Sequence, residues 1–256
     1  MATVSAATSV EVWHVSDPHL GRYSPRGADG RHGWDVLVDE VKRRRPSVVV
    51  ITGDLVADDP DDPDEQEFAQ RQVGRLVTRV LVVPGNHDVG DQEPRPGLPA
   101  DWVGTPITTE RRRRWTRRWG PDRWCEELAD WRLVGLDSQL LGSGLPDEKC
   151  QQHWLADVGA RSADRDVLLF SHQALDATTL GLPAHSWAAV PPPHGALVRD
   201  AFADARLQVV AHGHVHRHHD TTADGVRHLS APSLSGPIPD RADMTTPAGT
   251  ALRGWL

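Results

Sequence analysis

The sequence predicts an α/β fold in which strands and helices alternate along the chain. Apolar runs of strand length recur, and residues 47–52 form the clearest of them. Segments with apolar side chains at helical spacing lie between the runs, as over residues 33–45. Several of the runs end directly in polar residues, as at Gly53-Asp54. Because ligands of α/β sheets collect beyond the carboxyl ends of the strands, we expect the functional side chains to meet there.

Each element follows from its local pattern. Strands are predicted where runs of valine, isoleucine and leucine are bounded by glycine, proline or polar residues. In chain order they cover residues 10–16, 47–52, 80–83, 131–138, 166–171, 207–211, 226–230 and 250–256. Helices are predicted over residues 33–45, 65–78, 109–119, 151–160 and 196–205. No internal repeat or clear linker divides residues 1–256, so we expect a single domain.

The composition is typical of a globular protein. A chain of 256 residues with 38% hydrophobic and 25% charged residues can bury one large core, and no apolar run approaches the roughly 20 residues that span a bilayer. Residues 1–10 carry no basic residue and no apolar core of a signal peptide, and Cys125 and Cys150 fit a reducing compartment. We therefore expect a cytoplasmic protein. The formal net charge of −8 argues against general nucleic-acid binding.

Three further segments carry alternative interpretations. Residues 89–124 and 176–195 contain stretches rich in proline and small residues that are long for loops in a compact domain, and we expect them to form lids. Residues 109–119 hold six arginines, which we place on a solvated helix face with Trp115 and Trp119 as a core pair, in preference to a phosphate or nucleic-acid site. The acidic residues 58–67 are predicted to form a solvated loop that caps the next helix, in preference to a metal site.

The run Pro84-Gly85-Asn86-His87-Asp88 follows one predicted strand and gathers an amide, an imidazole and a carboxylate. These groups are ligands for borderline divalent metals, and histidine also transfers protons. Asparagine and aspartate are equally common in β-turns, so the run alone does not decide between a turn and a site.

Five predicted strand ends together favour a site. They carry two carboxylates, one amide and four imidazoles, in the residues Asp17, His19, Asp54, Asn86, His172, His214 and His216. A single aspartate or histidine after a strand is more often a turn residue or cap, but five such endings in one chain are a poor match to coincidence. This donor set suits two borderline metal ions such as Mn, Fe or Zn better than Ca, whose sites prefer oxygen ligands.

The ordered motifs resemble those of the calcineurin-like metallophosphoesterases. The matching residues are Asp17-Pro18-His19, Gly53-Asp54, Gly85-Asn86-His87-Asp88, His172 and Gly213-His214-Val215-His216. Their spacing is most similar to the compact bacterial phosphodiesterases of the class III cyclic-nucleotide and glycerophosphodiester type. The resemblance implies a four-layer α-β-β-α sandwich of two mixed β-sheets flanked by helices.

The resemblance also implies the roles of the site residues. Asp17, His19 and His216 would hold the first metal, Asn86, His172 and His214 would hold the second, and Asp54 would bridge them. His87 would lie over the phosphate as a donor or as the acid for the leaving oxygen, and Asp88 would orient its imidazole. The chain departs from that branch at His172-Gln173-Ala174-Leu175, where the branch commonly has His-His-Pro-Pro.

These observations lead to the hypothesis of a phosphoesterase with two metal ions, Mn or Fe in preference to Zn. Two such ions would share a hydroxide that attacks phosphorus in line. The expected substrate is a small phosphodiester, cyclic-nucleotide or glycerophosphodiester-like. The alternatives are a phosphomonoesterase, a nuclease, and a non-catalytic protein-binding scaffold. The sequence leaves open whether the chain forms a homodimer.

Overall fold

The computed structural model describes residues 10–22, 25–92, 96–99, 101–102, 104–240 and 242–256. Residues 1–9, on which the expectation about a signal peptide depends, lie outside this part of the chain. Within it, no helix combines the length and the apolarity that crossing a membrane requires.

Two β-sheets form the centre of the fold. The first contains β1 (Val12–Val15), β2 (Val48–Thr52) and β3 (Arg79–Val83), all parallel and in that order. The second has the order β4 (Trp124–Leu128), β5 (Trp131–Gly135), β6 (Asp166–Phe170), β7 (Arg206–His212), β9 (Val226–Ser230) and β8 (His219–Ala223). Its two edge strands pair antiparallel and the rest pair parallel.

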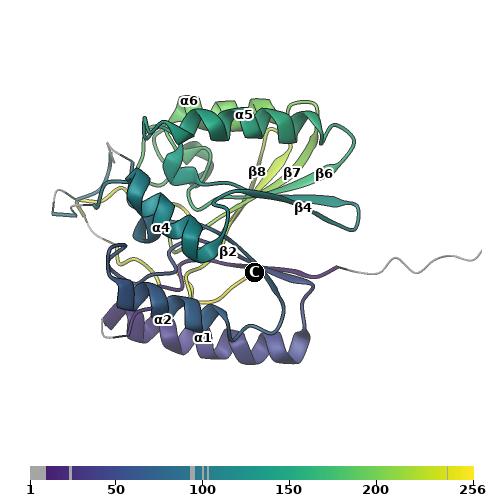
Figure 1. Cartoon of the computed structure of the whole chain (residues 1–256). Helices are drawn as coiled ribbons and strands as arrows, with labels where there is room; N and C mark the ends of the chain where they lie inside the picture. The colour runs from purple at the N-terminus through teal and green to yellow at the C-terminus, as the bar shows by residue number, and fades with distance from the viewer. Residues whose placement is uncertain (1–9, 23–24, 93–95, 100, 103, 241) are drawn as a thin grey trace, which may run out of the picture.

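The sheets pack face to face, and helices cover their outer faces (Figure 1). Val50 of β2 packs in one buried cluster with Leu133 and Phe170 of the second sheet. Helices α1 (Pro25–Arg44) and α2 (Pro63–Val73) cover the first sheet, while α5 (Asp147–Ala160) and α6 (Pro192–Ala201) cover the second. The predicted four-layer sandwich is therefore confirmed, with the difference that the first sheet is wholly parallel and only the second is mixed.

Several boundaries differ from the sequence prediction. Helix α1 begins at Pro25 rather than at residue 33. The edge strands β4 and β8 were not predicted, because they alternate exposed residues with half-buried ones and neither contains a continuous apolar run. The predicted strand over residues 250–256 is wrong, since this segment makes only isolated bridges, such as that between His218 and Thr250.

The arginine-rich helix α4 (Thr109–Trp119) largely matches its prediction. Trp115 is buried and its ring lies 5.6 Å from that of Trp119, while Arg113 is exposed. Arg112 is the exception, because it is buried among three carboxylates. The acidic loop also behaves as expected, since Asp62 caps the first turn of α2.

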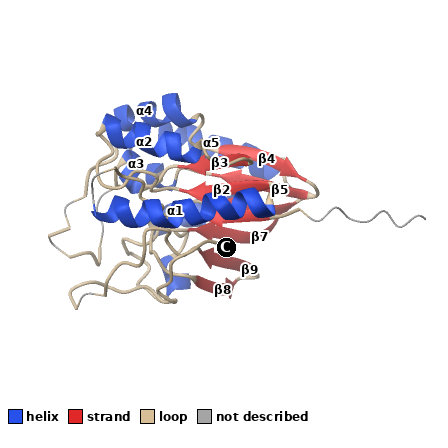
Figure 2. Ribbon diagram, turned by 90° about the horizontal axis from the view of Figure 1, so that it is seen from below, coloured by secondary structure: helices blue, strands red, loops and turns tan. Residues whose placement is uncertain are grey.

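The segment after β9 returns along the first sheet. The backbone of Leu256 accepts a hydrogen bond from His14 at 2.8 Å and donates one back at 2.9 Å. The ring of Trp255 stacks on Trp13 at 5.8 Å. Ser233, Leu234 and Leu256 thus contact the otherwise open edge of β1. Figure 2 shows the molecule from below, with α1 in front of the strands.

Candidate metal centre

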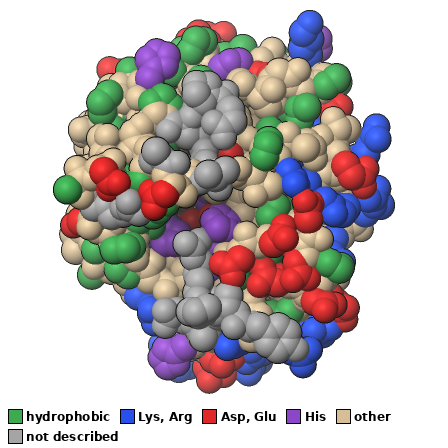
Figure 3. Space-filling model, turned by 90° about the vertical axis from the view of Figure 1, so that its left-hand side faces the viewer, with side chains coloured by type: hydrophobic (Ala, Val, Ile, Leu, Met, Phe, Trp, Pro, Cys, Tyr) green, Lys and Arg blue, Asp and Glu red, His purple; other side chains and the backbone are tan. Residues whose placement is uncertain are grey.

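The predicted site residues meet where the carboxyl ends of both sheets converge. Figure 3 views this face and shows histidine side chains on the floor of a hollow, with acidic side chains beside it. Two groups of side chains each place one ligand atom per residue within 4.8 Å of one another. The first contains Asp17, His19, Asp54 and His216, and the second contains Asp54, His172 and His214. Asp54 belongs to both groups, as the sequence prediction requires.

The backbone at these positions is strained. Eight described non-glycine residues have a positive φ, and five of them are predicted ligands, namely Asp17, His19, Asp54, His214 and His216. Non-glycine residues adopt this left-handed conformation at a cost, and it persists where the surrounding structure enforces it, commonly at functional sites. The strand ends therefore turn sharply so that their side chains point into one centre.

Each of the four imidazoles is held by a backbone carbonyl. The four pairs are His19 Nδ1 with Ala57 O at 3.3 Å, His172 Nδ1 with Thr52 O at 2.7 Å, His216 Nδ1 with Gly236 O at 2.7 Å, and His214 Nε2 with Trp187 O at 3.2 Å. Because a carbonyl can only accept, the ring nitrogen that faces it carries the proton. The other nitrogen of each ring then carries a lone pair, which is the form that binds metal ions.

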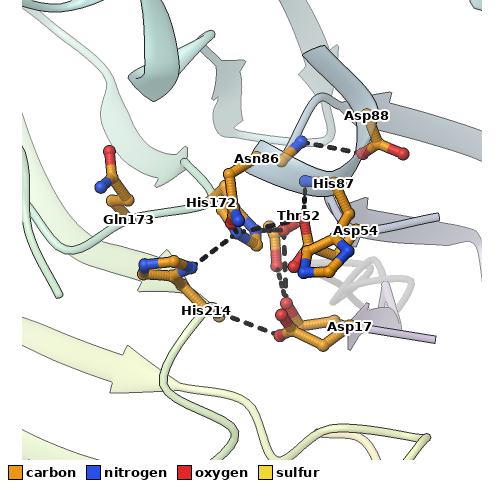
Figure 4. Close-up of polar contacts among 12 residues, drawn as sticks. Asp17, Thr52, Asp54, Asn86, His87, Asp88, His172, Gln173 and His214 are labelled. Atoms are coloured by element: carbon orange, nitrogen blue, oxygen red, sulfur yellow. Dashed lines mark hydrogen bonds and ion pairs between the residues drawn. The ribbon is translucent and has the colours of Figure 1, made fainter. Parts of the chain in front are cut away.

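These lone pairs face one another. His19 Nε2 lies 3.1 Å from His216 Nε2, and His172 Nε2 lies 3.0 Å from His214 Nδ1 (Figure 4). Two lone pairs at this distance repel unless a cation lies between or beside them. The Asp54 carboxylate lies between the pairs, 3.5 Å from His19 and 3.4 Å from His172. The residues therefore fit a two-metal site on this geometry alone.

The charges of the site lead to the same conclusion. Burial, together with the nearby charge of Asp17, raises the pKa of Asp54 well above its usual range. Burial also acts to raise the pKa of Asp17, but His216 and other imidazoles outweigh it and hold that pKa well below its usual range. Burial, aided by His172, lowers the pKa of His214 far enough to keep its ring neutral. The centre thus combines the neutral imidazole of His214 with acidic groups that favour bound cations.

The Asn86 and His87 side chains enter the centre from the one-turn helix α3 (Asn86–Val89). Asn86 Oδ1 lies 3.0 Å from His172 Nε2, which places the amide beside the second group. The backbone N–H of His87 donates to Asp54 at 2.9 Å, and its ring packs edge-on against His19 with 4.7 Å between the centroids. The run at residues 84–88 is therefore part of the site and not an isolated turn.

The Asp88 carboxylate is buried and hydrogen-bonds to the backbone of two neighbouring segments. Its carboxylate accepts hydrogen bonds from the backbone N–H groups of Leu55 at 3.0 Å, Val56 at 3.1 Å and Gly85 at 2.9 Å. Burial raises the pKa of Asp88 to about 7, against the effect of these bonds. The carboxylate thus ties the loop after β2 to the start of α3, and an orienting role of Asp88 toward the His87 imidazole stays a prediction.

A cavity of about 320 Å³ opens onto the centre. Besides predicted ligands and His87, it is lined by Trp102, Trp187 and Ile238, which the sequence analysis did not single out. Trp102 and Trp187 lie within the predicted lid segments. A large aromatic residue in a proline-rich stretch is the sequence signal that could have identified them. Asp58 of the acidic loop also lines the cavity.

The family model of the calcineurin-like phosphoesterases matches residues 10–218 of the chain. The chain belongs to the calcineurin-like phosphoesterase family. This membership, with the paired ligand groups, makes it a metal-dependent phosphoric ester hydrolase with a two-metal site. No individual curated protein matches the sequence significantly.

Solved structures of low sequence identity share the calcineurin-like fold. A dimetal phosphatase from Danio rerio is 15% identical with a TM-score of 0.60, and the match covers 88% of each chain. GAP50, the anchor in the inner membrane complex of Plasmodium, is 11% identical with a TM-score of 0.60, covering 96% of this chain and 79% of that one. Phosphopantetheinyl hydrolase from Mycobacterium tuberculosis is 14% identical with a TM-score of 0.55, covering 88% and 90%.

The absence of a side chain at Gly85 leaves room for Asp54 and His172 in the metal centre. A Cβ atom at this position would lie 2.5 Å from the backbone nitrogen of Asp54 and 2.8 Å from the His172 ring, and would also overlap Asp54 Oδ1. Relief requires backbone movement, so Gly85→Ala should destabilise the protein by about 1–3 kcal/mol and lower its metal content. Thermal unfolding and elemental analysis measure the two effects.

Gly74→Ala is the matched control for that change. Gly74 ends α2 with ordinary right-handed angles, and the nearest atoms to an added Cβ lie at 3.5 Å. This variant should keep its stability and its metal ions. A Gly85→Ala protein that bound metal as the wild type does would show that the loop around Asp54 is more adaptable than its packing indicates.

Proposed function

We propose that the protein hydrolyses a small phosphodiester, cyclic-nucleotide or glycerophosphodiester-like, at this centre. In the proposal, one metal ion is held by Asp17, His19 and His216, the second by Asn86, His172 and His214, and both by Asp54. The observation that carries it is the pair of facing imidazoles on each side of the Asp54 carboxylate. Their mixed nitrogen and oxygen donors favour Mn or Fe as the metals.

The metal ions and the protein side chains have separate roles in the proposed reaction. Bound metal ions supply positive charge and an activated water for attack at phosphorus. The carbonyl-anchored imidazoles hold their ligand nitrogens in place, so little reorganisation accompanies the reaction. His87 lines the cavity beside His19, and we assign it the donation of a proton to the leaving oxygen.

The cavity wall supports a diester over a monoester. Apart from histidines, the charged side chains among the described lining residues are carboxylates, including Asp58. A diester brings one negative charge into these surroundings, whereas an ionised monoester brings about two. Trp102 and Trp187 offer apolar surface to the second ester group, which a monoester lacks. Their positions also support the proposal that the segments 89–124 and 176–195 act as lids.

Paired assays with bis-p-nitrophenyl phosphate and p-nitrophenyl phosphate test the proposal. With Mn present, kcat/KM for the diester should exceed that for the monoester at least about tenfold, which corresponds to about 1.4 kcal/mol of transition-state binding. Chelation should abolish both activities, and added Mn should restore them. Faster hydrolysis of the monoester would favour the alternative of a phosphomonoesterase.

A further inference from the structure

Gln173 follows the proposed ligand His172, yet its side chain turns away from the metal centre (Figure 4). The residue is buried, with 3% of its surface exposed. Its position is therefore close enough to affect the site, but its amide makes its contacts elsewhere.

The Gln173 amide joins the two predicted lid segments. Its nitrogen donates to the backbone carbonyl of Trp187 at 3.3 Å, and its oxygen accepts from the side chain of Gln92 at 2.6 Å. Because the carbonyl can only accept, the amide orientation is fixed, and the oxygen must face Gln92. The carbonyl of Trp187 also accepts the Nε2 hydrogen bond of His214.

The backbone after Gln173 makes a second attachment to the same segment. The N–H of Ala174 donates to Ala188 O at 3.3 Å, and Ala174 O accepts from Val190 N at 3.0 Å. The Trp187 ring packs against the His214 ring with 5.1 Å between centroids and lines the cavity. Gln173 and Ala174 together hydrogen-bond to the segment that places Trp187 beside His214 and in the cavity wall.

We propose that Gln173 is a positioning residue for substrate binding: by clamping Trp187, it fixes the cavity wall that receives the second ester group of a phosphodiester. The inference rests on the proposed function for its substrate. The clamp itself is a structural claim that can be measured without catalysis.

The variant Gln173→Glu tests the clamp with almost no change in shape. A carboxylate still accepts from Gln92, but it places an oxygen against the Trp187 carbonyl in place of a donor. KM for bis-p-nitrophenyl phosphate should rise about tenfold, with kcat within about threefold of the wild-type value and two metal ions retained per chain. Gln70→Glu makes the same chemical change on the exposed face of α2 and should leave KM unchanged.

Hydrogen exchange over residues 185–190 provides the readout that does not depend on activity. Gln173→Ala should accelerate exchange in this segment relative to the wild type. If the wild type hydrolyses neither ester, the proposed function fails while the exchange comparison still decides the clamp. Unchanged exchange would overturn the inference. So would an unchanged KM in an active Gln173→Glu protein, or a parallel loss of metal and kcat, which would assign the amide to the metal centre instead.

Discussion

Asp54→Asn is expected to lower kcat/KM for the phosphodiester by roughly 10³-fold or more and to reduce the metal content. Asp54 is the one carboxylate that belongs to both ligand groups, so its loss weakens both metal positions at once. An amide keeps the shape of the side chain and removes the charge that both ions require. Steady-state kinetics with elemental analysis of the same preparation measure the two losses.

The same change should stabilise the metal-free protein. The pKa of Asp54 is raised well above its usual range in the fold, mainly by burial, so the folded chain keeps a proton that the unfolded chain releases. Stability therefore falls as the pH rises above the unfolded pKa, and asparagine removes this penalty. Urea unfolding of chelator-treated protein at pH 8 should show a higher midpoint for Asp54→Asn. Asp39→Asn, at an exposed position on α1, is the control, and full activity in Asp54→Asn would rule out the bridging role.

Arg112→Met is expected to cost about 3–5 kcal/mol of unfolding free energy, the largest effect on stability that we predict. Arg112 is 5% exposed and pairs with Asp122, with Asp137 at 3.0 Å and with Asp147 at 2.5 Å. Methionine leaves the buried carboxylate of Asp137 without the cation that it pairs with, while Asp122 keeps Arg123 at 3.1 Å. Arg113→Met, one position along on the exposed face of α4, should change stability by at most about 0.5 kcal/mol.

The cost of Arg112→Met should depend on pH. Burial, with a contribution from Asp122, raises the pKa of Asp137 to about 7, against an ordinary value of 3.8. Between pH 3.8 and about 7, Asp137 is deprotonated in the unfolded chain but still protonated in the folded one. The free energy of unfolding therefore falls as the pH rises through this range. Without Arg112 this pKa rises further, and the destabilisation measured by urea should be larger at pH 8 than at pH 5. An equal loss at both values would mean that Asp137 does not titrate in the fold.

The centre could be predicted from sequence because each ligand follows an apolar run that forms a parallel strand. Parallel strands bring their carboxyl ends to one edge of each sheet, and the packing of the two sheets then brings Asp17 and His216 together. The buried strands could also be predicted, because each of them is an apolar run. The edge strands β4 and β8 were not, since their polar, alternating pattern does not differ enough from that of a loop.

The surroundings of the centre depend on contacts that local sequence does not contain. Asp88 is adjacent to His87 in the chain, but its carboxylate turns to the backbone at Leu55 and Val56. Trp187 lines the cavity, and its segment hydrogen-bonds to Gln173 and Ala174, a pairing that no periodicity indicates. Local sequence therefore predicted the proposed ligands. Contacts between residues distant in sequence determine how those ligands and the cavity wall are held.

The segment that returns along β1 has a consequence for dissecting the protein. A fragment ending at residue 218, where the family match stops, would retain all seven proposed ligands. It would lack Gly236, whose carbonyl orients His216, and it would expose the unpaired backbone of β1. Open strand edges recruit other chains, so such a fragment should self-associate and make a poor minimal enzyme.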